Sequence, residues 1–398
     1  MSETQGKPAI LGGKATFDEV IPITSPSLPL LDDLREPLNE ILSTGQLTNG
    51  KYVEKFENEC ADYLGSKFAV AVSSCTLGLI LVEQALGLKG EVLIPSFTFS
   101  ATGHSLLWNN LRPFFVDCEL ESHNVDPILV EKSVTPRTSA ILAVDVFGNP
   151  CDREALCEIA RKRGLKLIID CAHSLGSLYG GKKFGGFADA QVFSLSPTKV
   201  VVAGEGGMVI TDNRDLAGIL RIARNYGNPG DYDCEFAGLN ARMEEFNAIL
   251  GIESLNMVEA TVGRRNALAA VFRSQLAKLP GISFQEVESG SRSTYKDFSI
   301  LVDEERFGLD RNLLGRALER ENIETRPYFE PPLHRQKAYK ALGLPTGNKL
   351  PNTEFLSSHA LSLPLFAHMK EETLEKICAA FEGIHEHAEE IKRQMANG

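Results

Sequence analysis

Residues 192–207 read VFSLSPTKVVVAGEGG: a strand-like apolar run, a short loop, and a turn rich in glycine. Lys199 is the single cation between Val192 and Gly204. Burying an ammonium costs free energy unless the charge is paired or neutralised. A lysine in such surroundings can lose its proton and become an amine that attacks a carbonyl. This stretch alone favours a simpler interpretation, in which Lys199 lies at the rim of a strand with its ammonium in water.

The sequence around this stretch, from about residue 67 to 212, alternates short apolar runs with helical patterns. The predicted strands are 68–72, 91–94, 113–117, 140–144, 165–169, 190–195 and 208–211, and the predicted helices are 77–86, 101–108 and 153–163. Strands that are apolar on both faces and alternate with helices indicate a largely parallel sheet covered on two sides. We therefore expect an α/β fold whose large domain holds this sheet.

The pattern changes after residue 212 and predicts a second, smaller α/β domain. Helices are expected over 215–224, 243–279 (interrupted near 261–263), 310–321 and 371–394, with a strand over 296–302. Asp310 stands where the N-cap of its helix is expected. A chain of 398 residues suits one large and one smaller domain. We expect the N-terminal segment and large domain in residues 1–250, and the small C-terminal domain in residues 251–398.

The composition excludes several classes of function. The chain has 41 Lys and Arg against 53 Asp and Glu, a net charge of −12 that argues against binding to nucleic-acid backbones. Its eight cysteines form no C-x-x-C pair and are typical of buried thiols in a reducing compartment. The first 16 residues hold no apolar signal core, and no stretch approaches the ~20 apolar residues of a membrane span. We expect a cytoplasmic protein that binds neither nucleic acid nor membrane.

Three polar features follow predicted strands, where parallel sheets bind ligands. Residues 72–78, VSSCTLG, pass from a strand into a helix whose N–H groups and hydroxyls suit a phosphate, although ordinary N-capping explains the same residues. Asp170 ends an apolar strand, where a carboxylate either meets a cation or caps the next turn. Ser194 and Lys199 lie on either side of a short loop.

A phosphate anchor, a carboxylate for a ring nitrogen and an amine for an aldehyde are together what pyridoxal 5′-phosphate (PLP) requires. The carboxylate keeps the ring nitrogen protonated, and the lysine first forms a Schiff base and then moves a proton. Each feature is weak alone, but the three in this order are specific. His173 follows Asp170 closely and could hydrogen-bond the ring, although a structural histidine is the simpler explanation for it.

The chain resembles the DegT/DnrJ/StrS family of aminotransferases, PLP enzymes of fold type I that act mostly on nucleotide-linked keto sugars. The likeness runs from residue 21 to the final helix. It rests on the motifs TGQLTNG (44–50), PSFTFSAT (95–102), VD (116–117), IDCAHSLG (169–176), FSLSPTKVVVAGEGG (193–207), NYG (225–227), GLNARM (238–243), PLH (332–334) and LPL (363–365). The resemblance implies a large domain with a seven-stranded, mostly parallel sheet covered by helices, and a smaller C-terminal α/β domain.

The resemblance also implies roles for residues around the cofactor ring. Lys199 is expected to form the Schiff base, and Asp170 to face the pyridine nitrogen. Phe99 stands where the family stacks an aromatic side chain on the ring. His173 occupies a position that faces the ring hydroxyl.

A second set of residues is expected to hold the cofactor phosphate. Cys75, Thr76 and Ser194 match the phosphate turn of the family. Asn240 matches an asparagine that reaches the phosphate from the neighbouring subunit, which implies an obligate homodimer. Cys75 departs from the common glycine or alanine, and Ala241 from a usual aromatic residue.

The resemblance predicts an aminotransferase that takes an amino group from glutamate and delivers it to a nucleotide-linked keto sugar, at C4 of a dTDP-4-keto-6-deoxyhexose. Dehydratase relatives carry histidine at the position of Lys199, so the intact lysine favours amino transfer. The segment RPYFE (326–330) differs from the family and bears on the sugar pocket. The candidate cations for the substrate diphosphate are Lys182, Lys183, Arg224 and Arg326, although a solvated surface charge is the simpler role for each.

Two alternatives stay open. The acceptor could be a cyclitol ketone such as an inosose, because family members on that path share these motifs. The chain could also be a non-catalytic sensor that uses a PLP-type fold to bind a ligand or partner, although it retains Lys199, Asp170 and Ser194 together. A nicotinamide enzyme is a weaker hypothesis, since residues 204–207 (GEGG) precede a strand and do not form the dinucleotide fingerprint.

Overall fold

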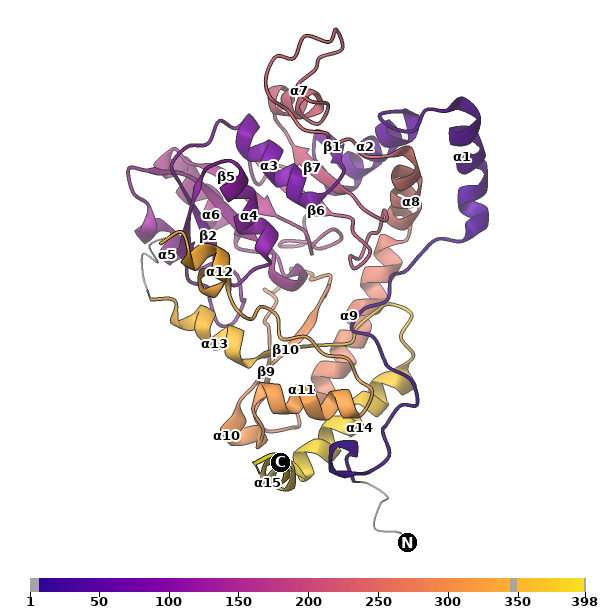
Figure 1. Ribbon diagram of the computed structural model, residues 1–398, viewed down its shortest axis with the longest axis vertical. Coiled ribbons are helices and arrows are strands. Elements are labelled where there is room, and N and C mark those ends of the chain that lie inside the picture. Colours follow the sequence, from indigo (N-terminus) through magenta and orange to yellow (C-terminus); the bar gives the residue numbers. More distant parts are fainter. Residues whose placement is uncertain (1–6, 344–348, 397–398) are drawn as a thin grey trace.

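The computed structural model describes residues 7–343 and 349–396. Its larger part is built on a seven-stranded sheet in the order β1-β7-β6-β5-β4-β2-β3 (Figure 1). The strands are β1 (Phe68–Val72), β2 (Glu91–Pro95), β3 (Arg112–Val116), β4 (Thr138–Val144), β5 (Lys166–Asp170), β6 (Ala190–Ser194) and β7 (Gly207–Thr211). β7 runs antiparallel to β1 and β6, and the other neighbouring pairs are parallel. The predicted mostly parallel sheet is confirmed.

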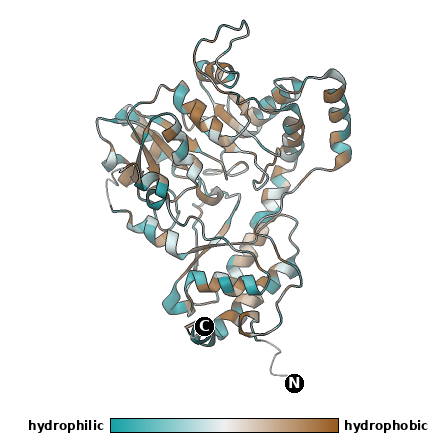
Figure 2. Ribbon diagram, viewed as in Figure 1, coloured by the Kyte–Doolittle hydropathy of each residue, from teal (hydrophilic) through white to brown (hydrophobic). Residues whose placement is uncertain are grey.

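Helices cover both faces of this sheet, and the core lies in two layers between helices and strands. The helices of one layer are α2 (Lys51–Leu64), α5 (Pro127–Ser133), α6 (Arg153–Arg163) and α8 (Glu245–Asn256). Those of the other are α3 (Cys75–Ala85), α4 (Ser100–Trp108) and α7 (Arg214–Ala223). Because both faces are buried, the middle positions of the strands are mostly apolar (Figure 2), while charged residues such as Arg112 and Lys166 stand at strand starts.

The smaller part of the molecule holds a three-stranded antiparallel sheet in the order β10-β9-β8. Its strands are β8 (Ile282–Phe284), β9 (Phe298–Val302) and β10 (Ala360–Leu363). The helices that follow α8 are α9 (Val258–Leu276), α10 (Glu304–Phe307), α11 (Arg311–Arg320), α12 (Lys337–Lys340), α13 (Pro351–His359), α14 (Glu371–Glu386) and α15 (Ala388–Ala396). This part confirms the predicted C-terminal α/β unit.

Two predicted helices are interrupted at places that the sequence did not indicate. The helix expected over 243–279 breaks at Met257, between α8 and α9, and not near residues 261–263. Gly263 lies inside α9, where a glycine is tolerated at a cost of about 1 kcal/mol relative to alanine. The last helix breaks at His387, between α14 and α15.

The N-terminal segment contacts the C-terminal elements. Its short 3₁₀ helix (Ala9–Leu11) is held by Glu321, whose carboxylate accepts the Ala9 N–H at 2.7 Å, and residue 21 pairs with residue 323. The chain then forms α1 (Leu31–Thr44), which stands at the edge of the molecule against α8 (Figure 1). The domain boundary at residue 250 stays a prediction.

Local signals set the ends of the elements that position the site. Asp152 caps α6 by accepting the Ala155 N–H at 3.0 Å, and Gly164 ends it in the left-handed conformation, with φ at 64°. β5 begins two residues later and ends on Asp170. The predicted cap at Asp310 is confirmed, because its carboxylate accepts the Leu313 N–H at 2.6 Å. Across residues 7–343 and 349–396, no helix combines the length and apolar content that a membrane crossing requires.

Gly78 tests how closely α3 packs on the sheet. A Cβ at this position would lie 2.8 Å from Val192 Cγ1 on β6, so Gly78→Ala overpacks the core and should destabilise the protein by about 1–3 kcal/mol. Gly218 on α7 is the matched control, because a Cβ there meets nothing within 4 Å. Gly218→Ala should stabilise by about 0.5–1 kcal/mol through helix propensity. Urea denaturation checks both, and equal effects would contradict the packing.

Candidate active site

A cavity of about 400 Å³ opens at the carboxyl ends of β5 and β6, beside the start of α3. It brings together most of the site residues predicted from the sequence: Cys75, Thr76, Phe99, Asp170, His173, Ser194 and Lys199. Asn240 does not line it. That residue is exposed on the segment after α7 and forms an isolated backbone bridge with Asn225.

Asp170 is the buried carboxylate of the cavity and is 4% exposed. Its Oδ1 accepts the Ala172 N–H at 3.0 Å and its Oδ2 accepts the Thr102 hydroxyl at 2.9 Å. Burial raises the pKa of Asp170, while these hydrogen bonds and the charge of Lys199 oppose that rise. Among the described residues Asp170 forms no ion pair, so a cation placed against it would be stabilised.

Lys199 lies in the turn after β6 and is the nucleophilic candidate. Its Nζ makes no hydrogen bond or ion pair with any residue of the described ranges, so the amine is held without a partner in the cavity. Burial, and next the nearby ammonium of Lys296, lower the pKa of Lys199 to about 8. Lys199 is half-buried in the cavity wall, and with this pKa roughly a tenth of the amine is unprotonated at pH 7.

The start of α3 forms a cradle with free N–H groups. The Ser74 hydroxyl accepts the Leu77 N–H at 3.2 Å, so this side chain serves as the N-cap. The N–H groups of Cys75 and Thr76 donate to no acceptor within the described residues, and Ser194 lies beside them in the cavity wall. A Cβ at position 207 would lie 2.7 Å from the Cys75 nitrogen, so only glycine permits this approach of β7. Such a helix start suits a phosphate.

Phe99 and His173 complete the walls of the cavity. Phe99 precedes α4 and is 61% exposed, which leaves one face of its ring open to a ligand. The His173 ring has a buried Nδ1 with no partner among the described residues, and burial lowers the pKa of this histidine. Phe99 was predicted only through the family resemblance, whereas His173 was also a candidate from its place after Asp170.

The C-terminal part adds residues to the cavity, and sequence reasoning missed two of them, Lys296 and Asp297. Lys296 and Asp297 precede β9 and form an ion pair of 2.8 Å, with side chains 7% and 4% exposed. Tyr328 and Phe329 come from the segment that departs from the family pattern. A lysine–aspartate pair directly before an apolar strand is the signal that could have indicated Lys296.

The cations predicted for a substrate diphosphate lie elsewhere. Arg224 is buried against Glu57, and Arg326 pairs with Glu324. Lys183 pairs with Glu259 at 3.2 Å, and the exposed Lys182 also lies outside the cavity wall. These four assignments were wrong for the cavity as described, because a basic residue in sequence gives no indication of its partner.

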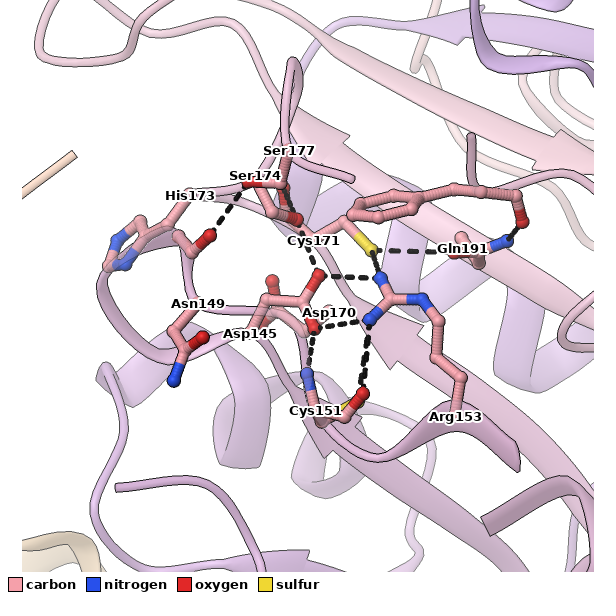
Figure 3. A network of polar contacts seen from close by, with 12 residues as sticks. Asp145, Asn149, Cys151, Arg153, Asp170, Cys171, His173, Ser174, Ser177 and Gln191 are labelled. Carbon is pink, nitrogen blue, oxygen red and sulfur yellow. Dashed lines mark hydrogen bonds and ion pairs between the residues drawn. The ribbon is translucent and has the colours of Figure 1, made fainter. Parts of the chain in front are cut away.

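A buried polar network supports the strand end from below (Figure 3). Arg153 and Asp145 are both 0% exposed and form a two-pronged ion pair of 2.9 and 2.7 Å. The Ser174 hydroxyl donates to Asp145 at 2.5 Å, and the Asp145 N–H donates to the Asp170 carbonyl at 3.1 Å. Although burial opposes it, the Arg153 guanidinium lowers the pKa of Asp145. The network fixes both ends of the 170–174 turn, whose His173 ring points away from Arg153 in Figure 3.

These features fit PLP. The uncompensated carboxylate of Asp170 matches a protonated ring nitrogen, and the free N–H groups at the start of α3 match a phosphate. The unpaired Lys199 amine matches an aldehyde, and the orphaned Nδ1 of His173 matches a polar substituent of the ring. The donor set therefore suits each end of the cofactor.

Comparison with solved structures defines the class of protein first. The fold superposes on DesI, described in the presence of its TDP-sugar product, with a TM-score of 0.90 and 35% identity over 98% of this chain and 99% of that one. Spr1654 from Streptococcus pneumoniae, a candidate sugar aminotransferase described in its PLP form, superposes with a TM-score of 0.84 at 23% identity, over 93% of this chain and 99% of that one. The fold is that of an aminotransferase.

The family model of the DegT/DnrJ/EryC1/StrS aminotransferases matches residues 31–382, and the chain belongs to this family. A relative in Escherichia coli, dTDP-4-amino-4,6-dideoxy-D-glucose transaminase, is 33% identical over 90% of this chain and 97% of its own length. Other curated relatives carry names that place the amino group at C3 of a dTDP-linked sugar. The protein is an enzyme of the aminotransferase class.

The network below the site gives a stability prediction. Asp145→Asn leaves the Arg153 charge buried without its partner, and we expect a loss of about 3–5 kcal/mol in unfolding free energy. Glu131, which pairs on the surface with Lys162 and Arg163, is the matched control, and Glu131→Gln should cause no measurable change. Chemical denaturation followed by circular dichroism gives both values. Equal stability of the two variants would show that the network is not structural.

Proposed function

We propose that this protein binds PLP in the described cavity and transfers an amino group from glutamate to a keto sugar carried on a nucleotide diphosphate. One observation carries the proposal: the unpaired amine of Lys199 and the cation-free carboxylate of Asp170 share one cavity with the N-terminus of α3. Each of these groups lacks the partner that PLP would bring. The family membership supports the same reaction class.

Each residue has a defined task in this proposal. PLP, when bound, supplies an aldehyde that captures the amine of a substrate and a ring that accepts electrons from the substrate carbon. Asp170 keeps the ring nitrogen protonated, and the buried network below holds this carboxylate in place. The Nζ of Lys199 takes a proton from the substrate carbon and returns it during the transfer. Phe99 covers one face of the site, and the N–H groups of Cys75 and Thr76, with the Ser194 hydroxyl, bind the phosphate.

We further infer that the acceptor is a dTDP-4-keto-6-deoxyhexose aminated at C4. The names of the E. coli and Shigella dysenteriae relatives, 33% and 34% identical, support C4 of a dTDP-linked sugar. Relatives named for C3 amination are 32% and 33% identical, so the position on the sugar depends on the pocket walls. The eight unpaired cysteines support a reducing, cytoplasmic compartment.

Lys199→Ala tests the cofactor and the reaction together. The purified wild-type protein should show the visible absorbance of lysine-bound PLP, and glutamate should bleach it while 2-oxoglutarate accumulates. The variant should lose the covalent absorbance and at least about 10³-fold of the activity, because the nucleophile and the base are the same amine. A wild-type protein that binds no PLP would refute the proposal.

A panel of acceptors tests the substrate. With glutamate as donor, we expect turnover of dTDP-4-keto-6-deoxyglucose and little or none of dTDP-3-keto-6-deoxyglucose or an inosose, measured by mass spectrometry of the aminated product. Preference for the 3-keto sugar would correct the position of amination. Preference for the inosose would favour the cyclitol alternative, and binding without any turnover would favour a sensor.

We also propose that the enzyme is a homodimer in which Asn240 reaches the cofactor phosphate of the neighbouring subunit. The helix α1 exposes a set of large apolar side chains along its length and flanks, although it stands at the edge of the molecule (Figures 1 and 2). These are Leu28, Leu30, Leu31, Leu42 and Leu47. A second copy would remove this apolar surface from water. Asn240 is exposed and lies outside the cavity of its own subunit, as expected of a residue that contacts the cofactor of the neighbouring subunit.

Leu31→Lys with Leu42→Lys tests the dimer. These charges should disfavour burial of α1 and shift the protein towards monomer, with loss of PLP affinity, as measured by light scattering and by cofactor titration. Asn240→Ala should weaken PLP binding several-fold while the dimer persists. A wild-type monomer that holds PLP would contradict the proposal.

A further inference from the structure

Two lysine side chains enter the same cavity from different parts of the fold. Lys199 follows β6 of the large sheet, whereas Lys296 precedes β9 of the small sheet. Only Lys296 has a carboxylate partner, since its Nζ lies 2.8 Å from Asp297 Oδ1. Two ammonium groups in one poorly solvated cavity repel each other, so the charged form is favoured on the one that has a counter-ion. Lys296 is thus the cation with a counter-ion, and the repulsion acts on the unpaired amine of Lys199.

The position of Lys296 is fixed by a third basic residue. Arg265 on α9 is 5% exposed and forms no ion pair with a described residue. Its Nε donates to the Thr294 carbonyl at 3.1 Å, and its Nη2 donates to the carbonyls of Lys296, at 2.9 Å, and Tyr295. One buried guanidinium thus binds three successive carbonyls directly before β9.

The same turn is tied to the large domain. The Thr294 hydroxyl donates to the His173 carbonyl at 2.5 Å, and the Thr294 N–H donates to the Ser177 hydroxyl oxygen at 3.1 Å. Tyr295 adopts a positive φ of 46°, a conformation that costs free energy for a residue other than glycine. The carbonyl contacts of Arg265 hold this conformation. The strained turn therefore places Lys296 and Asp297 in the cavity wall, where His173 also lies.

The other ionisable groups around the cavity do not replace this pair. Asp170 and His173 face Lys199 from the end of β5, Cys75 from the start of α3, Glu205 from the glycine-rich turn, and Tyr328 from the C-terminal part. Asp170 is held by Thr102 and Ala172, and burial raises the pKa of the Cys75 thiol well above its usual value. Of the cavity groups within the described residues, only Lys296 is a cation with a carboxylate partner.

We propose that Lys296, held on Asp297 and positioned by Arg265, is a positioning residue that keeps the Lys199 amine free of its proton. The ammonium of Lys296 disfavours a second positive charge on Lys199. The carboxylate of Asp297 has the opposite effect on Lys199 and partly offsets this repulsion. The catalytic meaning rests on the proposed function, because an unprotonated Lys199 is the form that attacks an aldehyde and accepts a proton. The protonation of Lys199 itself can be measured without cofactor.

The test uses the cofactor-free protein and a readout that is not activity. A small acylating reagent such as acetic anhydride acylates an amine only in its neutral form, and peptide mass spectrometry gives the labelling rate of Lys199 from pH 6 to pH 10. The wild-type midpoint should lie at about 8. Lys296→Met removes a like charge, so the midpoint should rise and the rate at pH 7 should fall on the order of tenfold. Asp297→Asn removes the balancing anion, so the midpoint should fall.

Two controls separate electrostatics from disruption of the fold. Lys296→Arg retains the cation and should keep the wild-type midpoint, while Lys182→Met removes an exposed lysine outside the cavity and should change nothing. Thermal unfolding shows whether each variant is folded. If Lys296→Met does not fold, the midpoints of Lys296→Arg and Asp297→Asn test the proposal. An unchanged midpoint in Lys296→Met, or shifts of equal sign in Lys296→Met and Asp297→Asn, would overturn the proposal. Failure of the protein to bind PLP would refute the proposed function but leave this result standing.

Discussion

The carboxylate of Asp170 is buried at the end of a parallel strand without a cation, and the surrounding structure is arranged to hold it there. The Thr102 hydroxyl, the Ala172 N–H and, at 4.0 Å, the Cys75 thiol donate to its oxygens, and none of these donors is charged. Next to it, Arg153 and Asp145 form a fully buried ion pair, and the backbone N–H of Asp145 donates a hydrogen bond to the Asp170 carbonyl. An acid placed so firmly in a poorly solvated site is costly unless a ligand supplies the opposite charge.

The sheet topology explains why the remaining groups meet this acid. The carboxyl ends of β5 and β6 lie side by side, so the residues after them, His173 and Lys199, reach one cavity. β7 runs antiparallel between β1 and β6, and its glycine lets the start of α3 approach the same edge. A helix start, an acid and an amine thus converge from segments that begin near residues 75, 170 and 199. The proposed aminotransferase site rests on this convergence, in a fold of that family.

The smaller part of the molecule contributes charged side chains to the wall of the cavity. Its first long strand is preceded by a turn in which Arg265 fixes three carbonyls and sets the Lys296–Asp297 pair against the wall of the site. The electrostatic environment of Lys199 therefore depends on a contact between two parts of the chain. A motion of the small domain would change the charge around the lysine as well as the shape of the pocket.

The sequence by itself predicted the seven strands of the large sheet, β9 and most helices, because these depend on local patterns, but it missed the short strands β8 and β10. It singled out Lys199 and Asp170 but left a structural role open for each. Apolar runs, turn residues and caps act over a few positions, so β5 with Asp170 at its end and α6 with its cap could be predicted directly. Phe99 and Asn240 entered through resemblance to a family, since no local pattern marks them. Only the tertiary structure decided that Lys296 lines the same cavity as Lys199, that Arg224 forms an ion pair with Glu57, and that Asn240 lies outside the cavity of its own subunit. Those facts depend on which distant segments meet. The charge state of Lys199 depends on Lys296, a neighbour about a hundred residues away in the chain.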